Sequence, residues 1–560
     1  MSAHWQTLTH GTEGFELAYT VVLIGMLAAL YRGRASAIKY LLAVLLALPM
    51  TLVAAIAVAL TSSLPRAAGI ASESGLQLAF GAAVLGLMGY AAGWVLLSYR
   101  VARGPQHRRG AVVSAGQAVP AAFDMRRVMR RAPDTVTIAG VSIPLEDETK
   151  HFKFIGTTGT GKSTAIEEIL SAALARGDRA IVADPDGGYL RRFYDPARGD
   201  VILNPWHSDA RKWDLFGEMS HDYDIEHLAR SLIPDSGGPD RIWCEYARTF
   251  LSEVMRQAIK ADIRDDGELV RIVTRATVKE LKQMLEATPA GPFLADGNEK
   301  MFGSLRSVAS SAIRVLQYTV VQKAAPLSVR GWVRAGDATS RGGRGGVLFL
   351  PYKAGEIAAL RSVVSAWMRL GVFEAMDRDE VDQRMWFVVD ELDALGEIDG
   401  LKDALARLRK FGGRCILGFQ SIAQVSGTYG RGSAETIVEN CGNTLILRCS
   451  ASEHGGTSEF ASKLIGQREV VHTVHGLARK PGEWVAARTR GELLRTEAAV
   501  MASEIERLPD LTGFLKLASI PDWQEVRLTP TPRAEGIRTH RPSAETSPAT
   551  PPGVPGARNG

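Results

Sequence analysis

The sequence predicts an α/β fold in which a largely parallel sheet carries a P-loop, with an all-helical insertion and apolar helices ahead of it. A glycine-rich loop joins a short apolar strand, Phe152–Ile155, to a helical segment, Thr164–Ala175. Short apolar strands alternate with helical segments on both sides of this loop, which is typical of parallel sheets. Three long apolar runs distinguish the first hundred residues from the rest of the chain.

Length and composition set few limits on the function of the chain. At 560 residues the chain has room for about three or four domains. Its formal net charge is only +5, so any surface for nucleic acid must be local. The cysteines are scattered without a CxxC spacing, which indicates neither a zinc site nor a disulfide framework and fits a reducing cytosol for the main domains. They are Cys244, Cys415, Cys441 and Cys449.

Residues 1–99 are expected to form a membrane domain with about three transmembrane helices. The apolar runs cover about Leu17–Tyr31, Tyr40–Leu60 and Leu76–Tyr99. Lysine and arginine are absent before the first run, frequent in the loop after it, reduced to Arg66 in the next loop and frequent again after the third run. This alternation predicts three spans with the N-terminus outside and the bulk of the chain in the cytoplasm. A two-span version that omits the first run places the N-terminus inside, against the charge pattern.

Residues 100–135 form a basic linker next to the membrane, rich in arginine, alanine and glycine. The arginines Arg126, Arg127, Arg130 and Arg131 fit a helix that meets anionic headgroups. A solvated basic connector fits them equally well.

The nucleotide-binding domain is expected to begin at residue 136 and to run, in a first part, to residue 217. Thr135–Ile143 alternates in strand fashion and reads as a hairpin that leads to the P-loop strand. Apolar strands follow at Arg179–Ala183 and Asp200–Leu203. In such sheets the ligand lies at the carboxyl ends of the strands, where the glycine-rich loop is also found.

The glycine-rich loop fits the P-loop pattern, in which Lys162 reaches the β- and γ-phosphates and the Ser163 hydroxyl binds Mg²⁺. Glycines allow successive backbone N–H groups to surround phosphate oxygens, and the helix N-terminus adds the positive end of its dipole. A chance match is the alternative in a chain with 56 glycines. The strand before and the helix after the loop are the context that the motif requires, so ATP binding is predicted. The residues predicted to bind it are Gly156, Thr157, Thr158, Gly159, Thr160, Gly161, Lys162, Ser163 and Thr164.

Residues 218–335 are expected to form an all-α insertion domain. Helical spacing of apolar residues marks Arg241–Ala261, Thr277–Ala287 and Met301–Gln317. The aromatic and apolar residues of the first helix are interpreted as helix core rather than as a platform for stacking bases (Ile242, Trp243, Tyr246, Phe250 and Val254). The basic residues of the insertion suit either a phosphate-facing surface or solvated helix faces.

The second part of the nucleotide-binding domain, residues 336–525, contains what reads as a Walker B strand. Gly346–Leu350 is apolar, and Met385–Val389 is an apolar strand that ends in Asp390 and Glu391. Asp390 is predicted to hold Mg²⁺, and Glu391 to act as the general base for the attacking water. Strands often end in solvated carboxylates, but an upstream P-loop in the same α/β pattern makes this pair a specific signal.

Two further residues are candidates for catalysis. Gln420 ends the strand Arg414–Phe419 and is a candidate sensor of the γ-phosphate, with a solvated strand-end residue as the alternative. Arg409 lies at the end of the helical segment Leu401–Phe411. It is a candidate arginine finger acting on a neighbouring subunit, an effect worth about 10³–10⁵ in rate where present, or else a cation that suits the helix dipole.

The chain resembles the type IV secretion coupling proteins, the conjugative ATPases of the TraD and TrwB kind, over roughly residues 140–525. The matching residues are Gly156–Thr164, Asp184–Pro185–Asp186–Gly187, Asn204–Pro205, Arg211–Lys212–Trp213–Asp214–Leu215–Phe216, Asp390–Glu391–Leu392, Arg409–Lys410–Phe411–Gly412 and Gln420–Ser421. The Asn-Pro and Lys-Trp-Asp-Leu-Phe elements are far more specific than the P-loop.

The resemblance implies a RecA-like motor that forms a homohexameric ring at the bacterial inner membrane. It implies that the motor recruits a relaxase bound to single-stranded DNA and drives the DNA into a type IV secretion channel. By position, Arg409 matches the finger arginine of the family and Gln420 its glutamine. Two departures remain: three spans are expected here where many members have two, and Asp186 replaces the lysine of the family's Asp-Pro-Lys-Gly element, so no role is assigned to that position.

Two alternatives to this function stay open at this point. One is a receptor or scaffold of the secretion system in which nucleotide serves assembly, and the other is a DNA pump of the FtsK or HerA kind. An intact Asp390–Glu391 pair disfavours the first, and the Lys-Trp-Asp-Leu-Phe block disfavours the second. Residues 526–560 are rich in proline, arginine and threonine and are expected to form a disordered tail.

Overall fold

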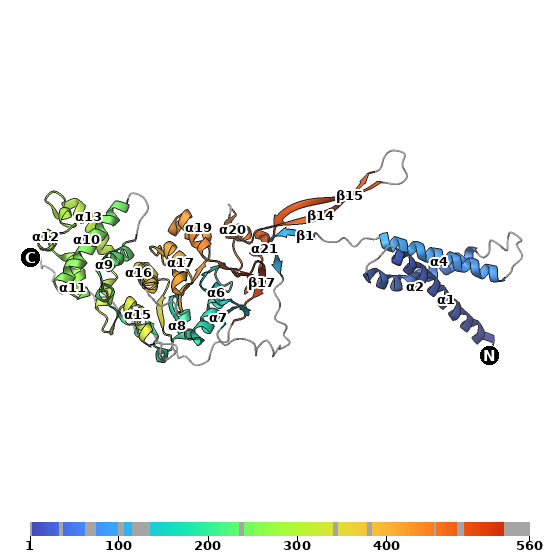
Figure 1. Cartoon of the computed structure of the whole chain (residues 1–560), viewed down its shortest axis with the longest axis horizontal. Helices are drawn as coiled ribbons and strands as arrows, with labels where there is room; N and C mark the ends of the chain where they lie inside the picture. The colour runs from blue at the N-terminus through green and yellow to red at the C-terminus, as the bar shows by residue number, and fades with distance from the viewer. Residues whose placement is uncertain are drawn as a thin grey trace, which may run out of the picture. The chain divides into compact units, whose positions relative to one another are not determined.

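The computed structural model describes residues 3–32, 37–61, 74–98, 106–114, 135–234, 240–339, 345–377, 384–452, 455–478 and 487–530. The chain divides into two compact units, Met1–His107 with Val471–Leu494, and Arg108–Val470 with Arg495–Gly560. Figure 1 shows the elements of each unit. The arginines predicted in the linker, from Arg126 to Arg131, lie outside the described residues, as does nearly all of the predicted tail.

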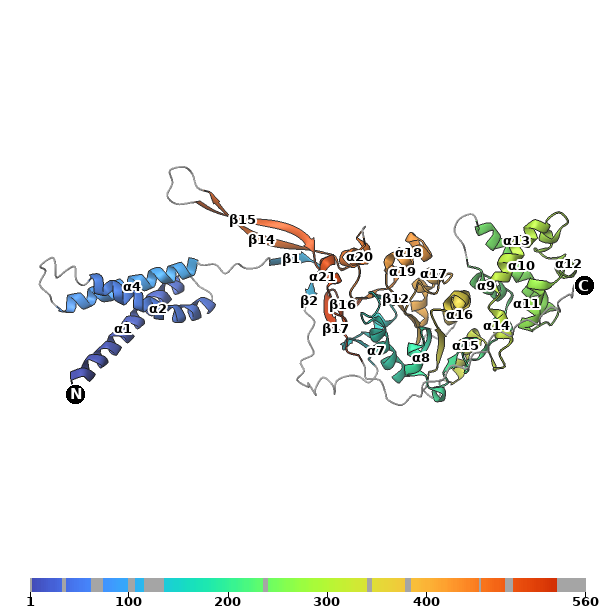
Figure 2. The same ribbon diagram turned by 180° about the vertical axis from the view of Figure 1, so that it is seen from behind.

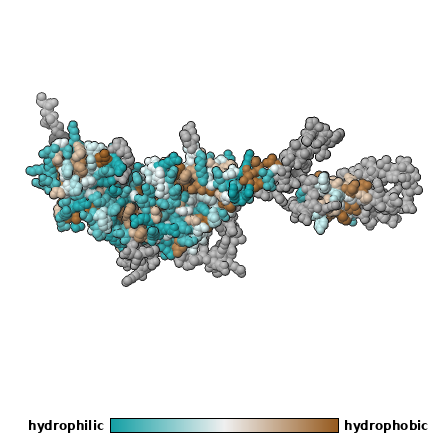
Figure 3. Space-filling view, turned by 45° about the horizontal axis from the view of Figure 1, so that its top comes forward, coloured by the Kyte–Doolittle hydropathy of each residue, from teal (hydrophilic) through white to brown (hydrophobic). Residues whose placement is uncertain are grey.

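The first unit contains three long helices that cover nearly all of the three apolar runs: α1 (Ala3–Arg32), α2 (Ala37–Thr61) and α4 (Ser74–Ser98). Helix α1 begins 14 residues before the apolar run Leu17–Tyr31. Val22, Met26 and Leu30 of α1 are buried against neighbouring helices. Leucines such as Leu41 and Leu87 are exposed, and Figure 3 shows this unit with hydrophobic residues on its surface. Among the residues described, no helix meets the length and apolarity that a membrane span requires.

The second unit is built on a ten-stranded sheet with the order β2-β17-β16-β13-β5-β12-β11-β6-β10-β7. The strands from β13 to β7 are parallel to one another, as the sequence predicts, whereas β16 and β17 join antiparallel. The strands are β2 (Val113–Ser114), β5 (Phe152–Ile155), β6 (Arg179–Pro185), β7 (Val201–Ile202), β10 (Val347–Tyr352), β11 (Met385–Val389), β12 (Gly413–Phe419), β13 (Asn443–Ile446), β16 (Thr512–Lys516) and β17 (Trp523–Arg527).

Hydrophobic clusters cover both faces of this sheet. In β11, Trp386 and Val388 belong to the cluster that includes α7, while Phe387 and Val389 belong to the cluster that includes α16. Successive side chains of a strand point to opposite faces, so a strand buried on both sides is a continuous apolar run. The helices beside the sheet are α6 (Leu145–Glu148), α7 (Lys162–Ala175), α8 (Gly188–Phe193), α16 (Ile357–Met376), α17 (Leu401–Leu408), α18 (Ile422–Tyr429), α19 (Arg431–Asn440), α20 (Gly456–Ile465) and α21 (Ala502–Glu506), with 3-10 turns η1 (Pro196–Arg198) and η5 (Arg409–Phe411).

Three smaller sheets accompany the large one among the described residues, and one of them is formed by β8 and β9 of the helical segment. The predicted hairpin ahead of the P-loop is present, with β3 (Thr137–Ile138) antiparallel to β4 (Val141–Ser142). Strands β1 (Gln106–Gly110), β14 (Gln467–Ala478) and β15 (Ala487–Ala498) form a three-stranded sheet that the sequence analysis did not anticipate.

The segment between β8 (Lys212–Trp213) and β9 (Pro326–Leu327) is helical, as the sequence predicts. Its elements are η2 (Phe216–Glu218), α9 (Asp222–Leu232), α10 (Arg241–Lys260), α11 (Asp266–Arg275), α12 (Val278–Leu285), η3 (Gly291–Leu294), α13 (Glu299–Ala312) and α14 (Leu316–Val320), and α15 (Val329–Thr339) follows β9. Figure 2 shows α10, α11, α13 and α14 gathered in one group.

Three details of the helical segment correct the sequence analysis. The expected helix Met301–Gln317 is divided into α13 and α14 by a turn at Ile313–Val315. Ile242 was expected in a helix core and is 55% exposed, although Phe250 and Val254 on the same helix are fully buried. The short strand β9 lies within a range expected to be all helix and pairs in parallel with β8.

The polypeptide enters the helical segment at residues 212–218 and leaves it at residues 326–330. We call these two stretches the neck, and the carboxylate of Glu218 holds them together. This fully buried carboxylate accepts hydrogen bonds from Trp213 Nε1 (2.9 Å), from the Ser328 hydroxyl (3.1 Å) and from the backbone N–H groups of Val329 (2.6 Å) and Arg330 (3.1 Å). The indole of Trp213 in turn lies edge-on against that of Trp367, with the two ring centroids 5.7 Å apart. The carboxylate thus joins the first turn of α15 to the entry strand, and the Lys-Trp-Asp-Leu-Phe element noted in the sequence belongs to this neck.

Replacing Glu218 with glutamine is expected to lower the free energy of unfolding by about 1–3 kcal/mol, because one oxygen that accepts hydrogen bonds becomes an NH₂ group facing buried donors. The measurement is chemical denaturation of the parent and variant chains. Glu245→Gln is the matched control, since Glu245 forms an exposed pair with Arg241 at 3.2 Å and such pairs are worth about 0.3–0.5 kcal/mol. Equal effects of the two substitutions would contradict the role given to Glu218.

Candidate functional site

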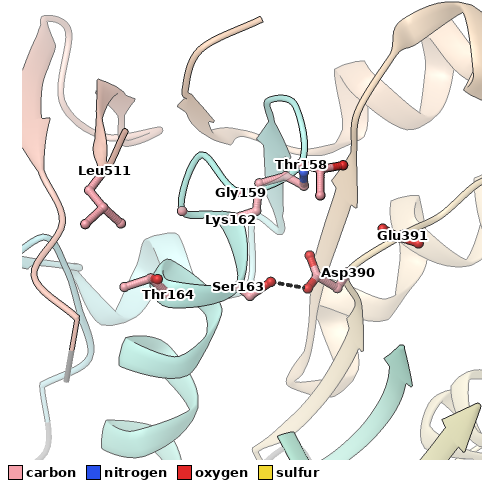
Figure 4. A pocket seen from close by; sticks show the side chains of 9 residues that line it. Thr158, Gly159, Lys162, Ser163, Thr164, Asp390, Glu391 and Leu511 are labelled. Atoms are coloured by element: carbon pink, nitrogen blue, oxygen red, sulfur yellow. Dashed lines mark hydrogen bonds between the residues drawn. The ribbon is translucent and has the colours of Figure 1, made fainter. Parts of the chain in front are cut away.

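The candidate site lies at the carboxyl edge of the large sheet. The P-loop follows β5, Asp390 and Glu391 follow β11, and Gln420 follows β12; since these strands are parallel neighbours, their ends meet at one edge. A cavity of about 190 Å³ at this edge is lined by Thr158, Gly159, Gly161, Lys162, Ser163, Thr164, Asp390, Glu391 and Leu511 (Figure 4). The structure therefore brings together the P-loop and the acidic pair that the sequence singles out.

The turn from the loop into α7 requires glycine at position 161. Gly161 has φ +117°, a backbone conformation that side chains other than hydrogen rarely adopt. A Cβ atom there would also lie 2.9 Å from Leu511 Cδ2 and 3.0 Å from Leu528 Cδ1. The 14-residue helix that starts after it directs its N-terminal N–H groups toward the loop, an arrangement that favours anions.

The Lys162 side chain is buried and folded back onto the loop. Its Nζ donates hydrogen bonds to the carbonyl oxygens of Gly156 (2.7 Å) and Thr157 (3.2 Å). Burial lowers the pKa of this ammonium group, and the carboxylates of Asp390 and Glu391 oppose that shift. A buried cation bonded only to neutral carbonyls, with carboxylates nearby, can exchange these contacts for a bound anion.

Asp390 receives two hydroxyl donors on one oxygen. Its Oδ2 atom accepts hydrogen bonds from Ser163 Oγ (2.6 Å, dashed in Figure 4) and from the Tyr189 hydroxyl (2.8 Å). Its Oδ1 atom is buried and has no hydrogen-bond partner among the described residues. Because an unpaired buried carboxylate oxygen is costly, and hydroxyl and carboxylate oxygens are ligands that Mg²⁺ accepts, the donor set fits a divalent cation.

Glu391 is held by a chain of two hydrogen bonds that reaches back to the P-loop. The Gln420 amide donates to Glu391 Oε1 (3.0 Å), and the Thr158 hydroxyl donates to Gln420 Oε1 (2.9 Å). Burial raises the pKa of the Glu391 carboxyl, and the neighbouring Asp390 carboxylate raises it further. A raised pKa makes this carboxylate a stronger proton acceptor at neutral pH.

Tyr189 is a site residue that the sequence analysis missed. It lies on α8, whose first turn is capped by Asp184: the two carboxylate oxygens accept the N–H groups of Tyr189 (3.1 Å) and Leu190 (2.7 Å). Burial raises the pKa of Asp184 to about 7. The Asp184–Pro185–Asp186–Gly187 motif was the available signal, because it marks the strand end and turn that aim Tyr189 at Asp390.

Leu511 is the second residue that was missed. Its N–H donates to the carbonyl of Thr160 (2.9 Å), and its side chain forms an apolar wall of the cavity beside the P-loop (Figure 4). It comes from the turn before β16, about 350 residues after the loop it contacts. No local pattern in the sequence marks this contact.

Arg409 does not lie at this cavity. It is exposed in η5, before the amino end of β12, and lines a separate cavity of about 270 Å³ together with Lys150, His151 and Glu439. The P-loop lies at the opposite, carboxyl edge of the same sheet. Within one chain, the structure therefore brings Gln420, but not Arg409, to the predicted site.

Comparisons with known proteins identify a family and relatives for this chain. Residues 135–529 match a family model described as the DNA-binding domain of type IV secretion-system coupling proteins. The chain is similar to coupling protein TraD of Escherichia coli (strain K12), with 26% identity over 442 residues, covering 78% of this chain and 61% of TraD. It thus spans about three fifths of the length of that relative.

The fold is similar to solved structures of a bacterial conjugative coupling protein, TrwBdeltaN70. An unbound form has a TM-score of 0.66 and 30% identity, covering 77% of this chain and 94% of that chain. TrwB in complex with ADP and Mg²⁺ has a TM-score of 0.64 and 30% identity, covering 78% of this chain and 96% of that one. The α/β fold of this chain is therefore that of the TrwB structures.

Gly418→Ala is expected to destabilise the chain by about 1–3 kcal/mol through overpacking. A Cβ atom at Gly418 in β12 would lie 2.2 Å from the backbone oxygen of Asp390, so the strand carrying the acidic pair would have to move. Thermal unfolding of the full chain measures the effect. Gly427→Ala in α18 is the control, because a Cβ atom there meets nothing within 4 Å and alanine favours helix by about 0.8–1.0 kcal/mol. Equal unfolding temperatures for the two variants would refute this packing argument.

Proposed function

This chain belongs to the family of type IV secretion-system coupling proteins, and on that premise we propose that it is an ATPase that moves DNA. In this proposal it recruits a relaxase bound to single-stranded DNA and uses ATP hydrolysis to drive the DNA into a type IV secretion channel. The observation that carries the proposal is the convergence of Lys162, Ser163, Asp390 and Glu391 on one cavity. The related TrwB structure in complex with ADP and Mg²⁺ supports ATP and Mg²⁺ as cofactors.

Each residue of the cavity would have a separate role in phosphoryl transfer. Lys162 would exchange the carbonyls of Gly156 and Thr157 for the β- and γ-phosphates, and the loop N–H groups would hold the remaining phosphate oxygens. Ser163 and Asp390 would hold Mg²⁺, which, when bound, neutralises charge on the phosphates. Tyr189 keeps the Asp390 carboxylate in place for this role.

Glu391 would accept the proton of the attacking water. Its raised pKa and its position at the edge of the cavity both suit a general base. The hydrogen bond from Gln420 orients the carboxylate, and the bond between Thr158 and Gln420 ties this orientation to the P-loop. Arrival of a γ-phosphate at the loop would disturb the Thr158 contact, which is how Gln420 would sense it.

We extend the proposal to the whole chain as follows. Residues 136–217 and 336–525 form a RecA-like nucleotide-binding domain interrupted by an all-α insertion domain at 218–335. In this proposal residues 1–99 hold the chain at the bacterial inner membrane through about three apolar helices, although the described helices do not meet the length and apolarity of a span. Residues 100–135 provide a basic linker and 526–560 a tail, with the bulk of the chain cytoplasmic. The helical group between β8 and β9 and the family match over residues 135–529 support the cytoplasmic part of this division.

The position of Arg409 supports a ring in which catalysis is completed between subunits. Arg409 is exposed and lies at the sheet edge opposite its own P-loop. An exposed arginine that cannot reach the cavity of its own chain is available to a neighbouring copy, as an arginine finger is. We therefore propose a homohexamer in which Arg409 serves the ATP of the next subunit.

Two substitutions test the proposed catalysis. Lys162→Ala is expected to abolish ATP binding, whereas Glu391→Gln should bind ATP as the parent does and hydrolyse it about 10²–10⁴-fold more slowly. ATP binding and ATPase rate are measured on the full chain with and without single-stranded DNA. Glu435→Gln, in an exposed pair with Arg431 at 3.2 Å, is the control. A parent chain that binds ATP but shows no ATPase activity with DNA would favour a receptor in which nucleotide serves assembly.

Mixing variants tests the role of Arg409. Arg409→Ala is expected to retain ATP binding and to lose about 10³-fold or more in hydrolysis, whereas Arg407→Ala, which removes an exposed arginine two residues earlier in the chain, should hydrolyse ATP as the parent does. Mixing Arg409→Ala with Glu391→Gln should restore part of the rate, because some interfaces then combine an intact Glu391 with an intact Arg409. Absence of any restoration, with mixed oligomers shown to form, would rule out action between subunits.

A further inference from the structure

We propose that Trp206 and Tyr318 form a stacking site for the bases of single-stranded DNA, with Arg314 and Lys323 beside it as contacts for the phosphates. The inference rests on the proposed function, because it names a place where the transported strand touches the chain. It concerns a different part of the molecule from the nucleotide cavity, and different residues carry it.

The two aromatic rings come from separate segments and remain open to solvent. Trp206 lies in the loop after β7 and Tyr318 in α14, and their ring centroids are 5.0 Å apart at an interplanar angle of 60°. Trp206 is 38% exposed and Tyr318 is 39% exposed, whereas large aromatic residues such as Phe250 and Trp213 are fully buried. Exposed rings of this kind suit nucleobases of any sequence, since every base offers a π-face.

Hydrogen bonds of the buried Asn204 tie the Trp206 loop to the end of β10 and to the residues after α14. The Asn204 side chain accepts the N–H of Trp206 (2.7 Å) and donates to the carbonyl of Pro351 (2.8 Å) at the end of β10. Gln322, just after α14, donates to the Asn204 carbonyl (3.4 Å). A fixed aromatic surface loses little conformational entropy on binding. The Asn204–Pro205 element noted in the sequence therefore serves to present Trp206.

Basic residues are concentrated in the stretch of sequence that contains Tyr318. Residues 301–336 contain five basic residues and no aspartate or glutamate. Arg330 pairs with Asp224 and Arg334 with Glu374. Arg314 and Lys323 are exposed, and neither forms a hydrogen bond or an ion pair through its side chain with the residues that the structure describes. Two carboxylates lie close to Trp206: Asp209 on the same loop, and Glu356, which accepts a hydrogen bond from the Asn204 side chain (3.3 Å).

The combination of rings and cations identifies the ligand. Cations alone would suit any polyanion, and exposed rings alone would suit an apolar partner. Their occurrence within one stretch of surface is the arrangement by which proteins hold a single strand, with stacked bases and neutralised phosphates. The pair also follows the carboxyl end of β7, so it lies at the same edge of the sheet as the nucleotide cavity.

The test compares two oligomers of equal length and charge on the full chain in detergent, by fluorescence anisotropy. One is a labelled oligothymidylate and the other a labelled abasic oligomer. Trp206→Ala combined with Tyr318→Ala should weaken oligothymidylate binding about tenfold, equivalent to about 1.4 kcal/mol, and leave the abasic oligomer unaffected. Tyr223→Ala, which removes a ring that is 50% exposed but lies between Asp222 and Asp224, is the matched control and should change neither.

A second variant tests the cations and does not depend on the aromatic variant folding. Arg314→Gln combined with Lys323→Gln should weaken binding of both oligomers and reduce the dependence of log K on log salt by about 1.4, since each phosphate contact on a single strand contributes about 0.7. Photo-crosslinking of 5-iododeoxyuridine in the oligomer, with mass-spectrometric mapping, should mark Trp206 or Tyr318.

The outcomes separate this site from the proposed function. If the parent binds single-stranded DNA and both double variants bind it equally well, the site is refuted while the function stands. If the aromatic variant instead changes the oligomeric state, the ring pair is an interface between copies and the inference is wrong. A parent that binds no single-stranded DNA overturns both. Basal ATPase activity should be the same in the parent and in the two double variants.

Discussion

The hydrogen bond between Ser163 and Asp390 is the contact on which the site depends. It joins the first turn of α7 to the end of β11 across 2.6 Å, although the two residues are 227 positions apart in the chain. The bond can form only because β5, β12 and β11 are parallel neighbours in register, so that their carboxyl ends meet. The packing on both faces of the sheet therefore fixes the strands in the positions that bring the Ser163 hydroxyl to the Asp390 carboxylate.

The site keeps several polar groups in positions that the fold itself does not favour. Lys162 is buried against neutral carbonyls, and Asp390 Oδ1 is buried without a partner among the described residues. Burial also raises the pKa of Glu391. Each of these arrangements costs free energy, and a phosphate, a cation or a proton would relieve that cost. The surrounding core of apolar strands offsets that cost, and Tyr189, fixed by Asp184, limits how far Asp390 can relax.

The helical segment is attached at a neck that is itself polar and buried. Glu218 binds four donors from both the entry and the exit of the segment, and the cations Arg330 and Arg334 pair with Asp224 and Glu374 close by. Such a neck fixes the direction in which the chain returns to the sheet. The basic residues of this region therefore have two different environments. Arg330 and Arg334 form ion pairs at the neck, whereas Arg314 and Lys323 are exposed on either side of Tyr318 in the sequence.

Contiguous residues were enough to predict the α/β class, the P-loop, the acidic pair and the helical insertion, because the spacing of those residues follows the geometry of a strand or a helix. The packing of the folded chain determines that Tyr189 contacts Asp390, that Leu511 contacts the P-loop, and that Arg409 lies away from the site, at the opposite edge of the sheet. The physical reason is that these contacts join segments whose local patterns are independent of one another. Periodicity says which face of an element is buried, but not which element lies against it.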